Sequence, residues 1–263
     1  MSAPAPTPPF EKHFSSSVLL WMRTDRPRQA GMDHWKGPHS GIIAATPGLT
    51  EYRQVHLAED NPGRWPAVDG VETTIPADRR VDGVAEVTFA SVLAPVKGRA
   101  QTQLAFADEV NVFRRTLLHA GPPGSSRWYD VGDGEVRART VLYLRRAPGI
   151  RRGAFRSFVN EQLTPALAAG TDLRELRTQV FLPWNERTWD TPGVAHDNPE
   201  GDRLHASVIL GFADHAARAD FYDSVAPALA PLVSTHLAAL HAYDVDATLT
   251  CGHDGRVLET PRS

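Results

Sequence analysis

The sequence predicts an α+β fold built from two fused ferredoxin-like units, each with the element order βαββαβ. One observation is that strand-like and helix-like stretches follow in this order twice, over residues 15–133 and 136–252. Another is that short residue matches relate the two halves. A single ferredoxin-like sheet has helices on one face and a bare second face, so two units can cover both bare faces by packing together. We therefore expect an internal pseudo-dimer, an α+β barrel with a cavity between the two sheets.

The elements of the first half follow from apolar patterning and from turn residues. A helical stretch is stopped by Pro47-Gly48, and a long proline-containing loop separates the second and third strands. The predicted order is strand 18–23, helix 28–45, strand 49–57, loop 59–82, strand 84–91, helix 100–119 and strand 127–131.

The second half repeats this order. Its long loop carries Trp184 and Trp189. The predicted order is strand 141–146, helix 152–169, strand 173–182, strand 204–212, helix 214–240 and strand 243–251.

Residue matches in the same order along both halves support a duplication. The run Val18-Leu19-Leu20 matches Val141-Leu142-Tyr143 at an offset of 123, and so does Phe89 with Phe212. Further matches are Leu49 with Leu173 and Arg53 with Arg177 at 124, and Tyr129-Asp130-Val131 with Tyr243-Asp244-Val245 at 114.

Composition excludes several classes of protein. The chain has 263 residues, of which 22% are charged, with a formal net charge of −3, so charge alone favours neither nucleic acid nor a membrane surface. No apolar run approaches the ~20 residues of a membrane span, and the N-terminus lacks a secretory signal. The single cysteine, Cys251, excludes an intrachain disulfide. We expect a cytoplasmic protein with a proline-rich, disordered tail at 1–14 and a flexible tail at 253–263.

Side chains alternate across a strand, which predicts the residues facing the cavity between the two sheets. In the second strand Leu49, Val55 and Leu57 form the more apolar set, which should lie under the helices. This directs Tyr52, Gln54 and His56 toward the cavity. The same reasoning on the third strand directs Glu86 and Thr88 there.

A carboxylate near an imidazole and a phenol in an apolar barrel can perform acid–base chemistry, although Glu86 and His56 could equally form a buried structural hydrogen bond. The repeat places Leu176, Val180 and Ile209 where the first half has Tyr52, His56 and Glu86. This asymmetry is expected if the first half carries the chemistry.

Two segments of the first half resemble the EthD family. They are His34-Trp35-Lys36-Gly37-Pro38-His39, followed by Pro47-Gly48-Leu49-Thr50-Glu51-Tyr52 and His56, and the strand segment Asp82-Gly83-Val84-Ala85-Glu86-Val87-Thr88-Phe89. The order Gly-Pro-His before Ser40 departs modestly from the family pattern, and the resemblance covers roughly residues 15 to 92. It implies the dimeric α+β barrel fold and marks Trp35, His39, Tyr52, His56 and Glu86 as site residues.

The resemblance also implies a class of activity. EthD-like and related barrels include cyclases, decarboxylases and dehydratases of aromatic natural products. We therefore expect a cofactor-independent enzyme of secondary metabolism, without metal, that acts on a hydrophobic polyketide-like or aromatic molecule. His39 or His56 would be the general base, Glu86 its partner or a proton donor, and Tyr52 a donor to the developing oxyanion. Trp35, Gln54 and Thr88 would contact the substrate.

Alternatives stay open at this point. His39, His56 and Glu86 could form an iron site, and haem could use His205, His215, His236 or His241. A non-enzymatic carrier of a hydrophobic molecule is a third reading, and further homo-oligomerisation is compatible with all of them. Nucleotide-binding glycine motifs and a Gly-x-Ser-x-Gly elbow are absent from the sequence. Arg145-Arg146 and Arg151-Arg152 form a solvated rim or contact an anionic substrate.

Overall fold

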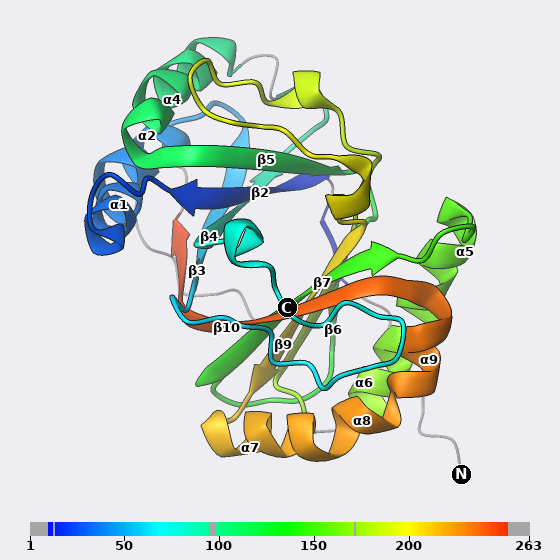
Figure 1. Cartoon of the computed structure of the whole chain (residues 1–263). Helices are drawn as coiled ribbons and strands as arrows, with labels where there is room; N and C mark the ends of the chain where they lie inside the picture. The colour runs from blue at the N-terminus through cyan, green and yellow to red at the C-terminus, as the bar shows by residue number, and fades with distance from the viewer. Residues whose placement is uncertain (1–9, 13, 95–97, 171, 252–263) are drawn as a thin grey trace.

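The strands in the described part of the chain belong to one antiparallel sheet, which has a half from each unit. The computed structural model describes residues 10–12, 14–94, 98–170 and 172–251, and within them ten strands pair in the order β1-β6-β8-β9-β7-β10-β3-β4-β2-β5. The sheet curls between two groups of helices, one for each half of the chain (Figure 1). None of the described helices is both long and apolar enough to cross a membrane.

The first unit has the strand order β5-β2-β4-β3, which is that of a ferredoxin-like sheet. Its helical segment α1-η1-α2 is continuous, with a π-helical turn at η1 that contains Pro38, and Gly48 closes the following turn with φ +79°. The elements are β2 (Phe14–Met22), α1 (Arg28–His34), η1 (Trp35–His39), α2 (Ser40–Ala44), β3 (Leu49–Leu57), η2 (Ala77–Arg79), β4 (Gly83–Phe89), α4 (Arg99–Val112) and β5 (Phe113–Gly121).

The second unit repeats that order as β10-β7-β9-β8, which confirms the predicted fold of two fused units. Its elements are β7 (Ala138–Arg146), α5 (Arg152–Ser157), η3 (Phe158–Leu163), α6 (Thr164–Gly170), β8 (Glu175–Val180), η4 (Glu186–Thr188), η5 (Glu200–Asp202), β9 (Ala206–Phe212), α7 (His215–Asp220), η6 (Phe221–Val225), α8 (Ala226–Ala228), α9 (Ala230–His236) and β10 (Leu237–Cys251).

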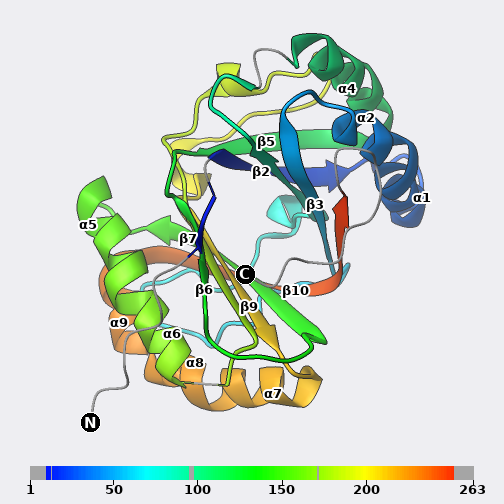
Figure 2. The same ribbon diagram turned by 180° about the vertical axis from the view of Figure 1, so that it is seen from behind.

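The last strand of each unit joins that unit to the other one. The first part of β10 pairs with β7, and its last part, from Val245 to Cys251, pairs with β3 of the first unit (Figure 2). In the same way β6 (Ser126–Tyr129), which follows β5, pairs with β8 of the second unit, and β1 (Phe10–Glu11) pairs with β6. The two sheets therefore close into one barrel.

Two predicted helices end too late. Helix α4 ends at Val112, so β5 takes the place of the last part of the predicted helix 100–119, and the predicted strand 127–131 is β6 (Ser126–Tyr129). Helix α9 ends at His236, so β10 begins before the predicted strand 243–251. Apolar segments such as 113–121 suit a helix or a strand, and pairing with the buried strand β2 decides the outcome. Phe113 and Leu237 are thus equivalent at an offset of 124, and the match between Tyr129 and Tyr243 at 114 is coincidental.

The expected N-terminal tail, 1–14, overlaps paired strands, because β1 begins at Phe10 and β2 at Phe14. Residues 1–9 of that tail, and all of the expected tail at 253–263, lie outside the described residues.

Each unit sends its long loop across to the other unit. Glu72, in the loop after β3, exchanges backbone hydrogen bonds with Ala238 and Leu240, both 2.9 Å between N and O. Ala195, in the loop after β8, bonds in the same manner to Arg114 and Thr116, both at 3.0 Å. This second loop, yellow in Figure 1, runs along β5 above the first unit.

The space between the two sheets is filled rather than open. Side chains from both units form one buried core there, including Leu19, Val55, Val84, Tyr143, Ile209 and Tyr243. The helices of the second unit cover a separate large core, and those of the first unit cover a smaller one. Packed side chains therefore occupy the space between the sheets in which the cavity was expected.

Candidate functional site

A cavity of about 610 Å³ lies between the sheet of the first unit and its helices α2 and α4. Apolar side chains make most of its wall: Val18, Leu20, Ile43, Leu49, Val87, Phe89 and Phe106. The crossing loop from the second unit contributes Arg187, Thr188 and Trp189. A volume and lining of this kind suit a small hydrophobic ligand.

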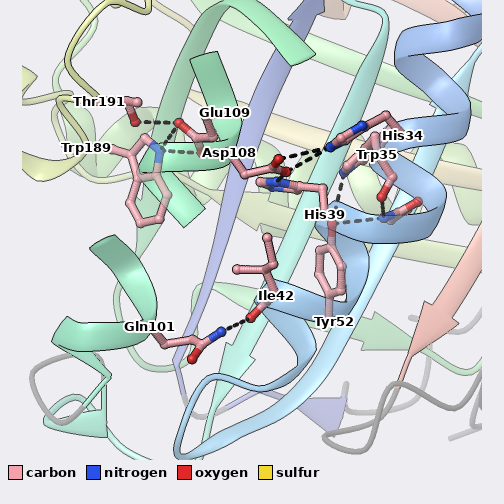
Figure 3. A network of polar contacts seen from close by, with 11 residues as sticks. His34, Trp35, His39, Ile42, Tyr52, Gln101, Asp108, Glu109, Trp189 and Thr191 are labelled. Atoms are coloured by element: carbon pink, nitrogen blue, oxygen red, sulfur yellow. Dashed lines mark hydrogen bonds and ion pairs between the residues drawn. The ribbon is translucent and has the colours of Figure 1, made fainter. Parts of the chain in front are cut away.

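Glu109 is a buried carboxyl group on the wall of this cavity. It lies on α4 with 2% of its surface exposed, and it accepts hydrogen bonds from Trp189 Nε1, at 3.0 Å, and from the Thr191 hydroxyl (Figure 3). Burial raises the pKa of Glu109 to about 7, although these two donors act in the opposite direction. The group can therefore both donate and accept a proton near neutral pH.

His39, which lies on η1, is held by the carboxylate of Asp108, which lies on α4 next to Glu109. Its Nδ1 lies 2.9 Å from Asp108 Oδ2, and His34 Nε2 lies 3.0 Å from the other oxygen of Asp108 (Figure 3). Burial lowers the pKa of His39, so its ring is neutral at pH 7. Burial acts to raise the pKa of Asp108, but hydrogen bonds from His39 and His34 outweigh it and the pKa is lowered. An ionised Asp108 accepts a hydrogen bond from the Nδ1–H group of His39. The lone pair of the His39 ring is then on Nε2, which can act as a base.

Tyr52 also lines the cavity, from strand β3. Its hydroxyl accepts hydrogen bonds from Trp35 Nε1, at 2.9 Å, and from Gln54 Nε2, at 3.0 Å. The Gln54 amide also donates to the backbone oxygen of Trp35, and His56 lies behind them, stacked on the Trp35 ring at 4.6 Å. Gly83 makes this packing feasible, because a Cβ there would lie 2.3 Å from the Trp35 ring.

The prediction that Tyr52, Gln54 and His56 face the space between the sheets is wrong. All three point under the helices, where Trp35 packs against them. The register of β3 against β4 shifts between Leu49 and Glu51, so Leu49 lies on the same face as Tyr52. A bulge of this kind changes the face of every residue before it. Val55 and Leu57, the other members of the apolar set, lie in the core between the two sheets. Both faces of β3 are therefore buried, and apolarity does not distinguish the face under the helices from the face between the sheets.

Glu86 and Thr88 do face the space between the sheets, as predicted, but that places them behind the sheet from the cavity. Glu86 accepts a hydrogen bond from Arg177 of the second unit at 2.7 Å. Burial would raise the pKa of Glu86, but Arg177, Arg53 and Lys12 lower it to about 2. The Glu86 side chain is therefore ionised and forms a structural ion pair across the barrel. The guanidinium carbons of Arg53 and Arg177 lie 4.7 and 4.4 Å from the centroid of the Trp128 ring.

The structure therefore brings together only part of the predicted set. His39 and Tyr52 line the cavity, whereas Trp35, Gln54 and His56 support it from behind. Asp108, Glu109, Trp189 and Thr191 were missed. One signal could have found Glu109: the offset of 124 aligns it with Val233, an apolar position on the equivalent helix.

The residues considered for iron or haem do not assemble at this cavity. Glu86 lies on the opposite face of the sheet from His39, and His205, His215, His236 and His241 are not among the cavity residues. In the part of the chain that the structure describes, no group of three or more His, Cys, Asp or Glu side chains could hold a metal ion. His39 is the histidine that lines this cavity.

Solved structures with the same fold resemble this chain at low sequence identity. An anthrone oxidase-like protein is 11% identical with a TM-score of 0.58, over 95% of this chain and 97% of that one. A putative monooxygenase from Fusobacterium nucleatum subsp. nucleatum ATCC 25586 is 5% identical with a TM-score of 0.54, over 96% and 100%. Another from Lactobacillus acidophilus NCFM is 9% identical with a TM-score of 0.50, over 94% and 100%.

No family model matches the sequence, and no curated protein matches it either. At these identities the likeness to solved structures shows the fold alone. The chain is a dimeric α+β barrel in which a single polypeptide supplies both ferredoxin-like halves.

Proposed function

We propose that the first unit is a cofactor-independent acid–base enzyme that moves a proton on a hydrophobic aromatic or polyketide-like molecule bound in the 610 Å³ cavity. The observation that carries the proposal is Glu109, a buried carboxyl group with a pKa near 7 on the wall of an apolar pocket. The resemblance of residues 15 to 92 to the EthD family supports the same class of activity.

His39 is the general base in this proposal. Asp108 holds Nδ1 at 2.9 Å and fixes the tautomer whose lone pair is on Nε2. A neutral imidazole can take a proton from a carbon next to a carbonyl group, and apolar walls hold the substrate in place without competing water. His56 is not suited to this role, because it lies behind Trp35 and its pKa is lowered to about 4, chiefly by burial.

Glu109 is the proton donor. In its neutral form the carboxyl group can hydrogen-bond a substrate oxygen while negative charge develops there, and it can then give that oxygen a proton. Trp189 and Thr191 orient the carboxyl group by donating to its oxygens. The rings of Trp189 and Phe106 pack edge to face with their centroids 4.8 Å apart, and both line the cavity as a wall for a planar ring system.

Two fates of the resulting enolate are open to this site. Cyclisation, dehydration or decarboxylation needs only the acid–base pair. Oxidation needs dioxygen as a co-substrate, and the fold shared with an anthrone oxidase-like protein makes this the second candidate. The two fates have the same first step, which can be measured separately.

Anthrone, a carbon acid with three fused rings, is a suitable probe. In heavy water under nitrogen, mass spectrometry follows exchange of its methylene hydrogens, which reports proton abstraction alone. We expect the wild-type protein to accelerate exchange over buffer, and His39→Gln to lose about 10²- to 10⁴-fold of the rate. The exposed residue His215 of the second unit provides the control His215→Gln, with an unchanged rate.

The outcomes separate the hypotheses. Binding of anthrone without faster exchange would indicate a carrier. If the wild-type protein neither binds anthrone nor accelerates its exchange over buffer, the proposal is overturned. In air, the oxidase fate consumes one O₂ for each anthraquinone formed and releases one water. Exchange without this oxidation would favour the cyclase, dehydratase or decarboxylase class.

A further inference from the structure

A second cavity of about 480 Å³ lies in the second unit, where β7 turns into α5. Four arginines line it: Arg145, Arg146, Arg152 and Arg203. Among the described residues that line it, Glu200 is the one carboxylate, and its side chain is exposed. The pocket therefore carries a marked excess of positive charge in a protein whose net charge is −3.

Three of these arginines have no carboxylate partner in the described part of the chain. Arg146 donates to the backbone oxygen of Ile150 at 2.5 Å, and Arg203 donates to that of Asn198 at 3.1 Å. No ion pair involves Arg152, whereas Arg145 lies 3.4 Å from Glu72. Guanidinium groups in such positions are available to an anion from solution.

The equivalent place in the first unit has its own counter-ion. Helix α1 begins at Arg28 as α5 begins at Arg152, and both follow nine-residue strands, β2 and β7. Arg28 Nε donates to Asp82 Oδ1 at 2.6 Å, so its charge is neutralised inside the protein. Asp82 comes directly before β4.

His205 takes the place of Asp82 in the second unit, directly before β9. Its Nδ1 accepts a hydrogen bond from the backbone N–H of Arg146 at 3.2 Å, as Asp82 accepts one from that of Met22 at 2.8 Å. The histidine thus keeps the backbone contact and loses the negative charge. Burial and the charges of Arg146, Arg145 and Arg203 lower the pKa of His205 to about 4, so it is neutral at pH 7.

Apolar side chains make a large part of the remaining pocket wall. Phe155, Phe181 and Leu182 line it, together with Trp184, whose ring lies 5.4 Å from the guanidinium carbon of Arg203. A flat organic group can lie against these side chains while a charged group reaches the arginines. The wall therefore favours an organic anion over an inorganic one.

We propose that this pocket binds a small organic oxyanion, an aryl or acyl phosphate or carboxylate, which supplies Arg152 with the negative charge that Asp82 supplies to Arg28 in the first unit. The site does not depend on the chemistry proposed for the other cavity. Arg152 provides the main contact, and Arg146 and Arg203 add charge around it.

Isothermal titration calorimetry on the full chain tests this with phenyl phosphate, benzoate and phenol. We expect one of the two anions to bind and Arg152→Ala to weaken its binding by about tenfold or more, the loss typical of a charged hydrogen bond. Arg151→Ala removes an equally exposed arginine that does not line the pocket, and its dissociation constant should stay within about twofold of wild type.

His205→Asp restores the residue type of the first unit, and we expect it to weaken anion binding as Arg152→Ala does, because Arg152 gains an internal partner. Circular dichroism verifies that this variant is folded, and the exposed position of Arg152 keeps the other variant informative. Tighter binding of phenyl phosphate indicates a phosphate ligand, and tighter binding of benzoate a carboxylate. Equal losses in Arg151→Ala and Arg152→Ala, or no heat from either anion, would overturn the proposal.

Discussion

The helices of the first unit enclose a cavity of about 610 Å³ against the sheet, whereas the equivalent positions of the second unit form a packed core, and its own cavity lies at the turn from β7 to α5. Both faces are built from a βαββαβ unit with the same strand order. Three polar residues that border the cavity of the first unit are apolar in the second: His39, Tyr52 and Glu109 correspond to Leu163, Leu176 and Val233, all fully buried. Ile43, which also borders the cavity, corresponds to the fully buried Leu167.

The crossing loops show the same contrast. Trp65 of the first loop is buried in the core of the second unit against Phe221, at 5.9 Å. Trp189, at the equivalent place in the second loop, lies at the edge of the cavity and donates to Glu109. The backbone arrangement is therefore compatible with either a packed core or a binding cavity, and a few side chains decide between them.

The largest effect should come from removing the titratable group that the second unit lacks. Glu109→Gln keeps the shape and an acceptor for Trp189, so anthrone should still bind, but the exchange rate should fall by about 10²- to 10⁴-fold. Glu161→Gln, on an exposed position of the second unit, is the matched control. An unchanged rate in Glu109→Gln would mean that the polar groups of the cavity are structural.

Packing should differ between equivalent leucine and isoleucine positions. Leu167→Ala empties a filled core and should lower the free energy of unfolding by about 2 to 5 kcal/mol. Ile43→Ala borders space that is already open, so we expect a loss of about 1 kcal/mol. Urea denaturation measures both free energies of unfolding. Equal losses would contradict the contrast between the packed core at Leu167 and the cavity at Ile43.

The buried carboxyl group should make stability depend on pH. Because the pKa of Glu109 is raised from 4.5 to about 7, the folded state holds a proton that the unfolded state releases between these values. The contribution of Glu109 to stability is fully present below pH 4.5 and is lost as the pH rises through 7, by on the order of 3 kcal/mol. Denaturation at several pH values should show this fall in wild type and less of it in Glu109→Gln. Parallel curves would show that Glu109 does not titrate in this range.

The smallest effect concerns the two equivalent tryptophans. Trp189→Phe removes one donor that stabilises the ionised form of Glu109, so the pKa of Glu109 should rise further, by about 0.5 to 1 unit. The midpoint of the pH profile of anthrone exchange should therefore move to higher pH. Trp65→Phe, in the packed core of the second unit, should leave the pH profile unchanged.

Repetition in the sequence was enough to predict the fold. The order of elements and the offsets of 123 and 124 indicated two units, and the EthD resemblance marked His39 and Tyr52, which both line the cavity. These features are local or periodic, so a single sequence carries them.

The remaining features depend on tertiary contacts. Both faces of β3 are buried, so apolar and polar positions do not separate them, and the bulge near Thr50 puts Leu49 on the same face as Tyr52 without a recognisable sequence signal. Glu109 looks like one more charged residue in a helix until Trp189, 80 residues later, covers it. A pattern read along one segment cannot reveal a partner that arrives from the other unit.

The pairing of β10 with β3 has a consequence for how the protein is made. During synthesis, the first unit is complete long before Val245 to Cys251 leave the ribosome, so the edge of β3 waits without a neighbour. An unpaired strand edge is a site of wrong association between nascent chains. We therefore expect chains truncated before residue 245 to aggregate. The last part of the fifteen-residue strand β10 covers the open edge of β3 only when synthesis of the strand is complete.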